Sequence, residues 1–397
     1  MLKSLDGDCS VLVISEDLVW QILKWMPVKS LMRFKCVCKL WLSIILNPLF
    51  VKMYKGGFKG VLLTGPETEK HPNRDIFYLD ITEDDDNDGV SAHISHHQTM
   101  NLPKGMRSTV PVNGLVCWYN GIHSIIYNVA TRETMVLPVS VWDSEFCDYY
   151  LGYHPSDNIY KVLKTCPVYN RQSRDFRHYT NSEILTVGVD SSWRSIDPVP
   201  CHLRTFAYCK NGVLHWADQG KTEGHLLSFD LDQEKFQFFD IPFRWLSYSW
   251  LFGPNAVLAS WYLRQPGTGY RKVTVLLYFE DLHHIRKGGQ NSSIGPWTKH
   301  EIDASISEEL QSFRPVSTLS NGKVIFIHNS AWAWNSLVPF YIYDQTEREL
   351  KKCFISESNS SSVAAEHIVD TSRFENAFYY EENIIPLSYL GSGYCSQ

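Results

Sequence analysis

A small all-α module followed by a large all-β domain is the fold that this sequence of 397 residues predicts. Apolar residues recur at helical spacing over residues 14–54, which favours three short helices. From residue 56 onward, short apolar runs are separated by Gly, Asn, Asp and Pro, as is typical of strands and turns. An aromatic share of 14% also favours β structure. We therefore predict a flexible N-terminus over 1–13, a helical module over 14–54 and a β-repeat domain over 56–397.

Local signals place the helices of the module. The first begins after Ser15, whose side chain can accept a hydrogen bond from a backbone N–H, and ends before Pro27. Its predicted apolar stripe consists of Leu18, Ile22, Leu23 and Met26. The second helix begins at Ser30 and ends at Asn47-Pro48, with a stripe of Leu31, Phe34, Cys38, Trp41, Leu42 and Ile45. A short third helical turn over 49–53 follows.

Size and charge predict that this module binds a partner. About forty residues bury little surface alone, so several apolar side chains should stay exposed, although the helices could also simply cover the larger domain. Residues 15–55 hold seven Lys or Arg against Glu16 and Asp17, a charge that favours an acidic partner but is also compatible with a solvated helix face. The net charge of −6 argues against a general nucleic-acid binder.

The sequence of the module resembles the plant F-box. The most specific stretch runs from Pro27 to Trp41, and Ile14–Val19 and Asn47–Phe50 flank it. Ile14-Ser15 and Trp25-Met26-Pro27 depart from the Leu-Pro and Arg-Leu-Pro that the family usually has, but they keep apolar contact area. The resemblance implies docking on the Skp-type linker of an SCF ligase, together with a cullin and a RING subunit. The residues carried over to the linker interface are Leu18, Ile22, Leu23, Pro27, Val28, Leu31, Phe34, Val37, Cys38 and Trp41.

The β region contains an imperfect repeat. Asn113-Gly114, Asn211-Gly212 and Asn321-Gly322 each form a turn signal that tolerates positive φ, and an apolar strand follows each of them. Second and third strands then follow in every copy. The copies start 98 and 110 residues apart, so two blades in each interval give the spacing of about 50 residues that kelch-type propellers have. We predict a kelch-like β-propeller of six or seven blades; the alternative is a pair of β-sandwiches.

This region also resembles the plant F-box-associated interaction domain, and comes closest to the S-locus-like branch. The landmarks that carry the resemblance are 128–133, 152–155, 160–162, 191–194, 227–230 and 379–384. In that family the domain binds a protein substrate and has no catalytic activity. Two loops are candidate substrate contacts because they combine aromatic side chains with Arg or stand beside polar residues. Their residues are Tyr169, Arg171, Arg174, Phe176 and Arg177, and Trp332 and Trp334. An exposed connecting loop and core aromatics are the alternative interpretations.

Metal and catalytic motifs are not predicted. His93, His96 and His97 form a cluster in an expected loop, without a Cys at ligand spacing. The ten Cys lack a disulfide framework and are predicted to be reduced, mostly buried thiols. The chain shows no signal peptide and no apolar run of 18 residues, so an intracellular location in cytoplasm or nucleus is expected, without membrane insertion.

The prediction is thus a non-catalytic adaptor without a cofactor. The helical module binds the linker, and the β domain presents an unknown protein substrate for ubiquitination. One alternative is an interaction protein that keeps an F-box but acts outside a ligase. The other is a β-propeller lectin or enzyme, which a bound sugar or ion would support.

Overall fold

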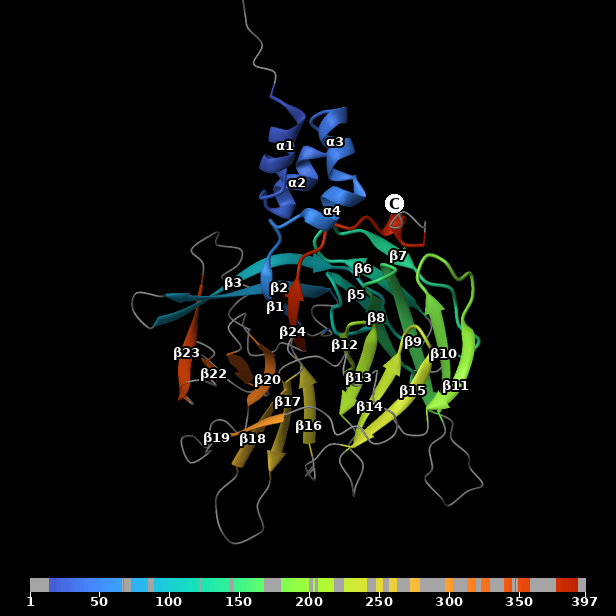
Figure 1. Ribbon diagram of the computed structural model, residues 1–397, viewed down its shortest axis with the longest axis vertical. Coiled ribbons are helices and arrows are strands. Elements are labelled where there is room, and N and C mark those ends of the chain that lie inside the picture. Colours follow the sequence, from blue (N-terminus) through green and yellow to red (C-terminus); the bar gives the residue numbers. More distant parts are fainter. Residues whose placement is uncertain are drawn as a thin grey trace, which may run out of the picture.

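The computed structural model describes residues 14–391. Within this range it leaves out 66, 68–72, 85–88, 122, 143–145, 168–179, 200–202, 204–205, 218–224, 241–247, 253–256, 263–271, 279–296, 303–312, 319–322, 329–338, 345–346, 348 and 358–375. The predicted flexible segment 1–13 lies outside the described residues. Figure 1 shows the helical module standing on one face of the β domain, with its last helix nearest to that domain.

The helical module contains the helices α1 (Glu16–Leu23), α2 (Val28–Phe34), α3 (Lys39–Ile45) and α4 (Pro48–Met53). Ser15 is the N-cap of α1, where its Oγ accepts from Leu18 N at 3.4 Å. The prediction of a single second helix is wrong. It is divided into α2 and α3 because Cys38 has an extended backbone, with φ −159° and ψ 166°. The break lets Phe34 pack edge-on against Trp41, with ring centroids 4.9 Å apart.

The β domain begins at Lys59. Its strands are β1 (Lys59–Thr64), β2 (Arg74–Asp84), β3 (Gly89–Met100), β4 (Arg107–Ser108), β5 (Leu115–Tyr119), β6 (Ser124–Asn128), β7 (Thr134–Val136), β8 (Asp148–His154), β9 (Ile159–Pro167), β10 (Thr180–Thr186), β11 (Arg194–Val199), β12 (Tyr208–Lys210), β13 (Val213–Ala217), β14 (His225–Asp230), β15 (Lys235–Asp240), β16 (Tyr248–Phe252), β17 (Val257–Tyr262), β18 (Lys272–Tyr278), β19 (Trp297–Ile302), β20 (Phe313–Thr318), β21 (Val324–His328), β22 (Pro339–Asp344), β23 (Glu349–Glu357) and β24 (Asn376–Glu381). A short 3₁₀ helix, η4, covers Leu387–Tyr389.

The described strands form five sheets rather than the six or seven blades predicted. Four sheets have four strands each, namely β4–β7, β8–β11, β12–β15 and β16–β19. The fifth has eight strands in the order β20-β21-β22-β23-β3-β2-β1-β24. Its two antiparallel halves are joined because β23 pairs in parallel with β3, from Ile355 opposite Ala92 to Glu357 opposite Ile94. This pairing merges two four-stranded groups into one sheet and corrects the predicted number of blades.

The β domain closes through its own ends. The last strand, β24, pairs with the first, β1, over the register from Lys59 opposite Glu381 to Thr64 opposite Asn376. The Asn376 side chain also donates to Ser108 Oγ at 3.3 Å, which connects β24 to the next sheet. Such closure pairs strand edges that would otherwise be exposed.

The repeat predicted from the sequence is confirmed at two of its three turns. Asn113 and Gly114 have φ values of 47° and 81°, and Asn211 and Gly212 have 50° and 79°. The third turn lies outside the described residues. The second strand of each copy ends at an Asn or Asp whose Oδ1 accepts from backbone N–H groups of the following turn. These residues are Asn128, Asp230 and Asp344.

The predicted loop around the histidine cluster is wrong. His93, His96 and His97 lie on β3, which pairs antiparallel with β2 along its whole length. Ala92 and Ile94 are buried on the core side, and His93 between them is exposed. The polar composition of this strand hides its alternation, because only one face joins the core.

Candidate partner-binding surface on the helical module

Helix α1 has two apolar faces. Val19 and Leu23 are buried in the core of the module, with exposed fractions of 4% and 0%. Leu18 and Ile22 lie about 100° around the helix axis from them, on an adjacent side, and are 51% and 45% exposed. The core therefore does not need Leu18 or Ile22, and their exposure is the usual mark of a surface that binds a partner.

The other residues predicted for the linker interface are divided between the interior and the surface. Leu23, Val28 and Leu31 are buried in the core of the module, and their predicted contact with a partner stays a prediction. Phe34 and Trp41 are half-buried beside that core. The exposed members of the set are Leu18, Ile22, Pro27, Val37 and Cys38.

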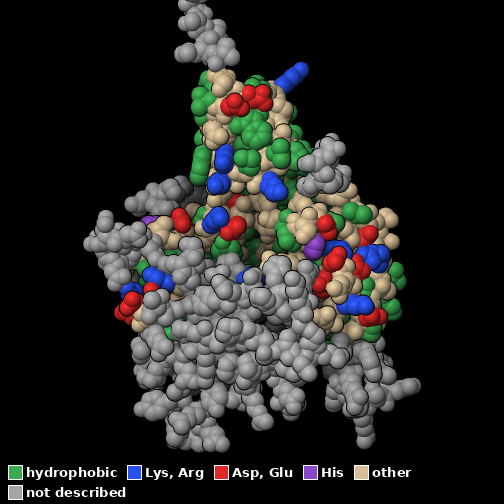
Figure 2. Space-filling model, viewed as in Figure 1, with side chains coloured by type: hydrophobic (Ala, Val, Ile, Leu, Met, Phe, Trp, Pro, Cys, Tyr) green, Lys and Arg blue, Asp and Glu red, His purple; other side chains and the backbone are tan. Residues whose placement is uncertain are grey.

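Further apolar side chains on the module are exposed that the sequence analysis did not assign to the interface. They are Ile14, Trp25, Leu40, Leu42, Leu49 and Met53. Among the described residues, nine of the sixteen exposed large hydrophobic side chains lie within 14–53, a concentration that single scattered surface residues do not explain. Figure 2 shows hydrophobic side chains gathered on this module. The signal in the sequence that could have indicated these residues was a second apolar face at helical spacing.

The module is anchored on the β domain. Its core includes Ala130 and Ile384 of that domain, and the Tyr389 hydroxyl donates to Leu46 O at 2.6 Å. The connecting chain is tight, because a Cβ at Gly56 would lie 2.3 Å from Met26 O. These contacts hold the exposed apolar surface in a fixed orientation relative to the sheets.

A buried polar cluster lies beneath the connection. Glu382 accepts from Phe58 N at 2.8 Å and from the Tyr78 hydroxyl at 2.9 Å. Burial raises the pKa of the Glu382 carboxyl, and these two hydrogen bonds oppose the rise. His97 stacks on Tyr78 with ring centroids 4.3 Å apart, and its Nε2 lies 3.0 Å from Val129 O. Because a carbonyl oxygen only accepts, we assign the ring proton to Nε2.

Acid is expected to destabilise this connection. Burial lowers the pKa of His97 from 6.5 to about 4, and the positive charge of Arg132 also lowers it. Between pH 6.5 and about 4, the unfolded chain therefore binds more protons than the folded chain. The stability that neutral His97 contributes is lost as the pH falls through this range. The melting temperature should fall less steeply over this range in His97→Gln than in the native chain. His93→Gln, on the same strand, is the control; equal slopes for the native chain and His97→Gln would contradict this assignment.

Comparison with known proteins identifies the parts of the chain. The F-box domain matches residues 12–53, and the F-box associated beta propeller domain matches residues 68–252. An Arabidopsis thaliana protein named F-box protein At4g38870 is 28% identical over 376 residues, covering 86% of this chain and 81% of its own length. Another from the same plant, named F-box protein At1g32420, is 30% identical over 239 residues, covering 57% of this chain and 74% of its own length. The chain belongs to the F-box protein family.

Solved structures resemble this F-box protein only weakly. TolB from Acinetobacter baumannii gives a TM-score of 0.42 at 10% identity, covering 75% of this chain and 63% of TolB. A TolB of Agrobacterium tumefaciens gives a TM-score of 0.36 at 11% identity, covering 72% of this chain and 94% of that TolB. Neither similarity supports a functional argument. None of the F-box helices has the length or the apolar run required to cross a bilayer, nor has any other helix in the described ranges.

The predicted substrate contacts of this F-box protein lie outside the described residues. This holds for Tyr169, Arg171, Arg174, Phe176 and Arg177, and for Trp332 and Trp334. They therefore stay predictions.

The prediction that all cysteines are reduced is wrong for one pair, because Cys147 and Cys166 form a disulfide. Cys147 lies directly before β8 and Cys166 lies near the end of β9, and the antiparallel pairing of these strands brings them side by side. The prediction that the thiols are mostly buried also fails in the F-box, where Cys36 and Cys38 are exposed. Scattered spacing in the sequence gave no signal for the pair, and cysteine usage alone no longer supports a reducing compartment.

Proposed function

We propose that this F-box protein is the substrate-recognition subunit of an SCF-type E3 ubiquitin ligase. The exposed apolar surface of the F-box docks on a Skp-type linker, which joins the chain to a cullin and a RING subunit. The propeller domain recruits a protein substrate. The chain acts without catalytic residues of its own, because bringing the substrate close to a ubiquitin-charged partner supplies the acceleration.

The observation that carries this proposal is the second apolar face of the F-box. A complete core formed by Leu23, Leu31 and Phe50 leaves Leu18, Ile22 and Val37 free for a partner. Only a partner that covers them would remove this apolar surface from water. The anchoring of the F-box on the propeller supports the same function, since a fixed orientation positions a bound substrate relative to the linker.

Finer assignments belong to the same proposal. We propose that the chain belongs to the S-locus-like branch, which its resemblance supports, and that its propeller is kelch-like, which the spacing of its repeat supports. A role in an SCF complex favours a location in cytoplasm or nucleus. The substrate is a protein of unknown identity, and the candidate contacts are the two loops that contain Arg171 and Trp332. The proposal includes no cofactor, nucleic acid or membrane.

Replacing Leu18 and Ile22 by Asp is expected to weaken linker binding about 10- to 100-fold, because buried apolar anchors dominate interface energies. The fold should be retained, since both side chains lie outside the F-box core. Affinity purification of the full chain followed by mass spectrometry measures recovery of the Skp-type linker and the cullin. Binding of the purified linker gives the change in affinity.

Val141 and Val189 provide the matched control, because both are exposed apolar residues of the propeller domain. Val141→Asp with Val189→Asp should leave linker recovery unchanged. Recovery of no linker by the native chain would favour an interaction protein that acts outside a ligase. Equal recovery by the native chain and the F-box variant would show that Leu18 and Ile22 are not the docking face.

A further inference from the structure

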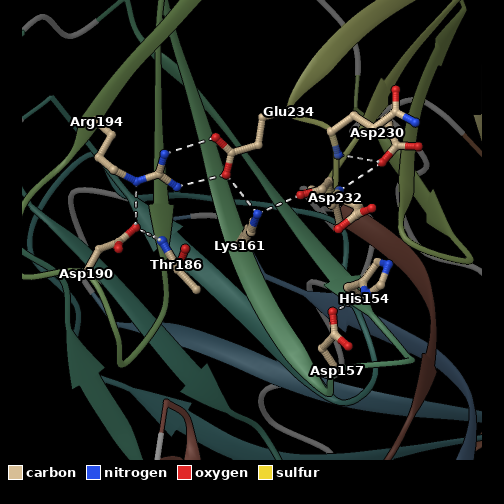
Figure 3. Close-up of polar contacts among 11 residues, drawn as sticks. His154, Asp157, Lys161, Thr186, Asp190, Arg194, Asp230, Asp232 and Glu234 are labelled. Carbon is tan, nitrogen blue, oxygen red and sulfur yellow. Dashed lines mark hydrogen bonds and ion pairs between the residues drawn. The ribbon is translucent and has the colours of Figure 1, made fainter. Parts of the chain in front are cut away.

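Two turns of neighbouring sheets lie side by side on the propeller domain. The turn between β8 and β9 contains Asp157 and follows His154, and the turn between β14 and β15 contains Asp232. Figure 3 shows the three side chains near one another. The donor atoms of His154, Asp157 and Asp232 all lie within 4.8 Å of one another. Two ligand atoms of one cation lie at most about 4 Å apart, because metal–ligand distances are about 2 Å, so small side-chain movements would let these three atoms share one ion.

Charged contacts connect the second turn to the first sheet. Lys161 on β9 donates to Leu231 O at 2.6 Å and to Glu234 Oε1 at 2.8 Å. Arg194 on β11 donates to both oxygens of Glu234, at 2.8 and 3.0 Å. The position of Asp232 relative to His154 is therefore set by a network that spans the two sheets (Figure 3).

Each donor residue is also fixed locally. Asp232 N donates to Asp230 Oδ1 at 2.8 Å, which holds the second turn. Asn158 adopts a positive φ of 54°, and its side chain accepts from the Tyr153 hydroxyl at 2.8 Å. This hydrogen bond holds the first turn, between β8 and β9. His154 packs against Gly212, where a Cβ would lie 2.5 Å from the ring Cδ2. A ring held in this way is prepared for binding, because little side-chain freedom remains to be lost.

The Nδ1 nitrogen of His154 has no hydrogen-bond partner among the described residues. This nitrogen is buried and lies 3.2 Å from Asp157 Oδ2, with which it forms an ion pair only when the ring is protonated. The His154 side chain is 12% exposed, whereas Asp157 and Asp232 are both exposed. In the neutral ring, a buried nitrogen without a hydrogen bond costs free energy, and a cation between the nitrogen and the carboxylates would remove that cost.

We propose that His154, Asp157 and Asp232 form a binding site for a divalent first-row transition ion of the zinc type. One imidazole and two carboxylates match the mixed nitrogen and oxygen donors that such ions accept, whereas calcium and magnesium take oxygen ligands alone. Three protein ligands leave a coordination position for water or for a side chain of a bound partner. The ion links the turns of two sheets, so its binding stabilises their contact.

Isothermal titration of the metal-free full chain with Zn²⁺ tests this site. The native chain should bind one equivalent, and His154→Gln, Asp157→Asn and Asp232→Asn should each lower the affinity about tenfold or more. The two Asp variants change exposed residues, and their melting temperatures without metal show that folding is retained. Zn²⁺ should raise the melting temperature of the native chain more than that of the variants.

Asp197→Asn is the matched control. Asp197 is exposed on β11. Its neighbours Ile196 and Val199 pair with Ser182 and Thr180 of β10, at the end of the sheet that is far from the β8–β9 turn. This variant should bind like the native chain. The proposal is overturned if the native chain shows no saturable binding, or if the Asp157 and Asp232 variants bind as tightly as the native chain. A signal lost in Cys36→Ser with Cys38→Ser but kept in Asp232→Asn would also overturn it, because the exposed thiols would then be the ligands.

Discussion

Replacing Leu31 by Ala is expected to lower the free energy of unfolding of the F-box by about 2–5 kcal/mol, the range for a buried Leu that leaves a cavity. Leu31 has an exposed fraction of 0% and packs in the core that Leu23, Ile44 and Phe50 form. A module of four short helices has little other core to compensate. Linker binding should be lost together with the fold. Chemical denaturation followed by circular dichroism, with linker binding measured on the same samples, checks both effects.

Leu42→Ala is the matched control for this prediction. Leu42 lies on α3 of the same module but is 37% exposed, so its truncation removes less buried surface and leaves no enclosed cavity. The expected cost is well below that of Leu31→Ala. A similar loss of stability in both variants would mean that the core of the F-box is not where the structure places it. Leu31→Ala therefore cannot distinguish docking from folding, whereas the exposed pair of Leu18 and Ile22 can.

Replacing Trp216 by Ala is expected to cost about 3–5 kcal/mol of propeller stability. Trp216 is 1% exposed and lies between two sheets, because it contacts Tyr150 of β8 edge-on with ring centroids 5.0 Å apart. Its cluster also contains Leu163 of β9 and Leu227 of β14. Loss of this side chain opens a cavity between sheets, and thermal unfolding of the full chain measures the result.

Trp142→Ala removes the same side chain from a different environment. Trp142 is 47% exposed, so its loss should cost much less than the loss of Trp216. Equal shifts in melting temperature would contradict the packing between β8 and β13. A large shift for Trp216 alone would show that the contact between these sheets limits the stability of the propeller.

Turn chemistry made much of the β domain predictable. Asn113-Gly114 and Asn211-Gly212 adopt the positive φ that the dipeptide signals, because a local preference needs no distant partner. The strands that follow, β5 and β13, begin immediately after these turns. Ser15 likewise fixes the start of the first helix through local capping, whereas α1 ends at Leu23 and Pro27 is the N-cap of α2.

Which apolar face is buried was less predictable. The expected stripe of α1 contained Leu18, Ile22 and Leu23 with Met26 after them, yet only Leu23 of these enters the core, together with Val19. Both faces have helical spacing, so periodicity alone cannot say which is covered by the module and which is left for a partner. Periodicity alone also could not predict the extended backbone at Cys38, because packing divides a continuous apolar stripe into two helices there.

The sequence by itself determined the family, the order of helical and β parts, and the repeat of turn and three strands, because these depend on short-range preferences. Only the tertiary structure decided the parallel pairing of β23 with β3, the disulfide of Cys147 with Cys166 and the meeting of His154 with Asp232. Each of these joins segments distant along the chain. Their partners are chosen by the closure of the sheets and by burial, which no local pattern encodes.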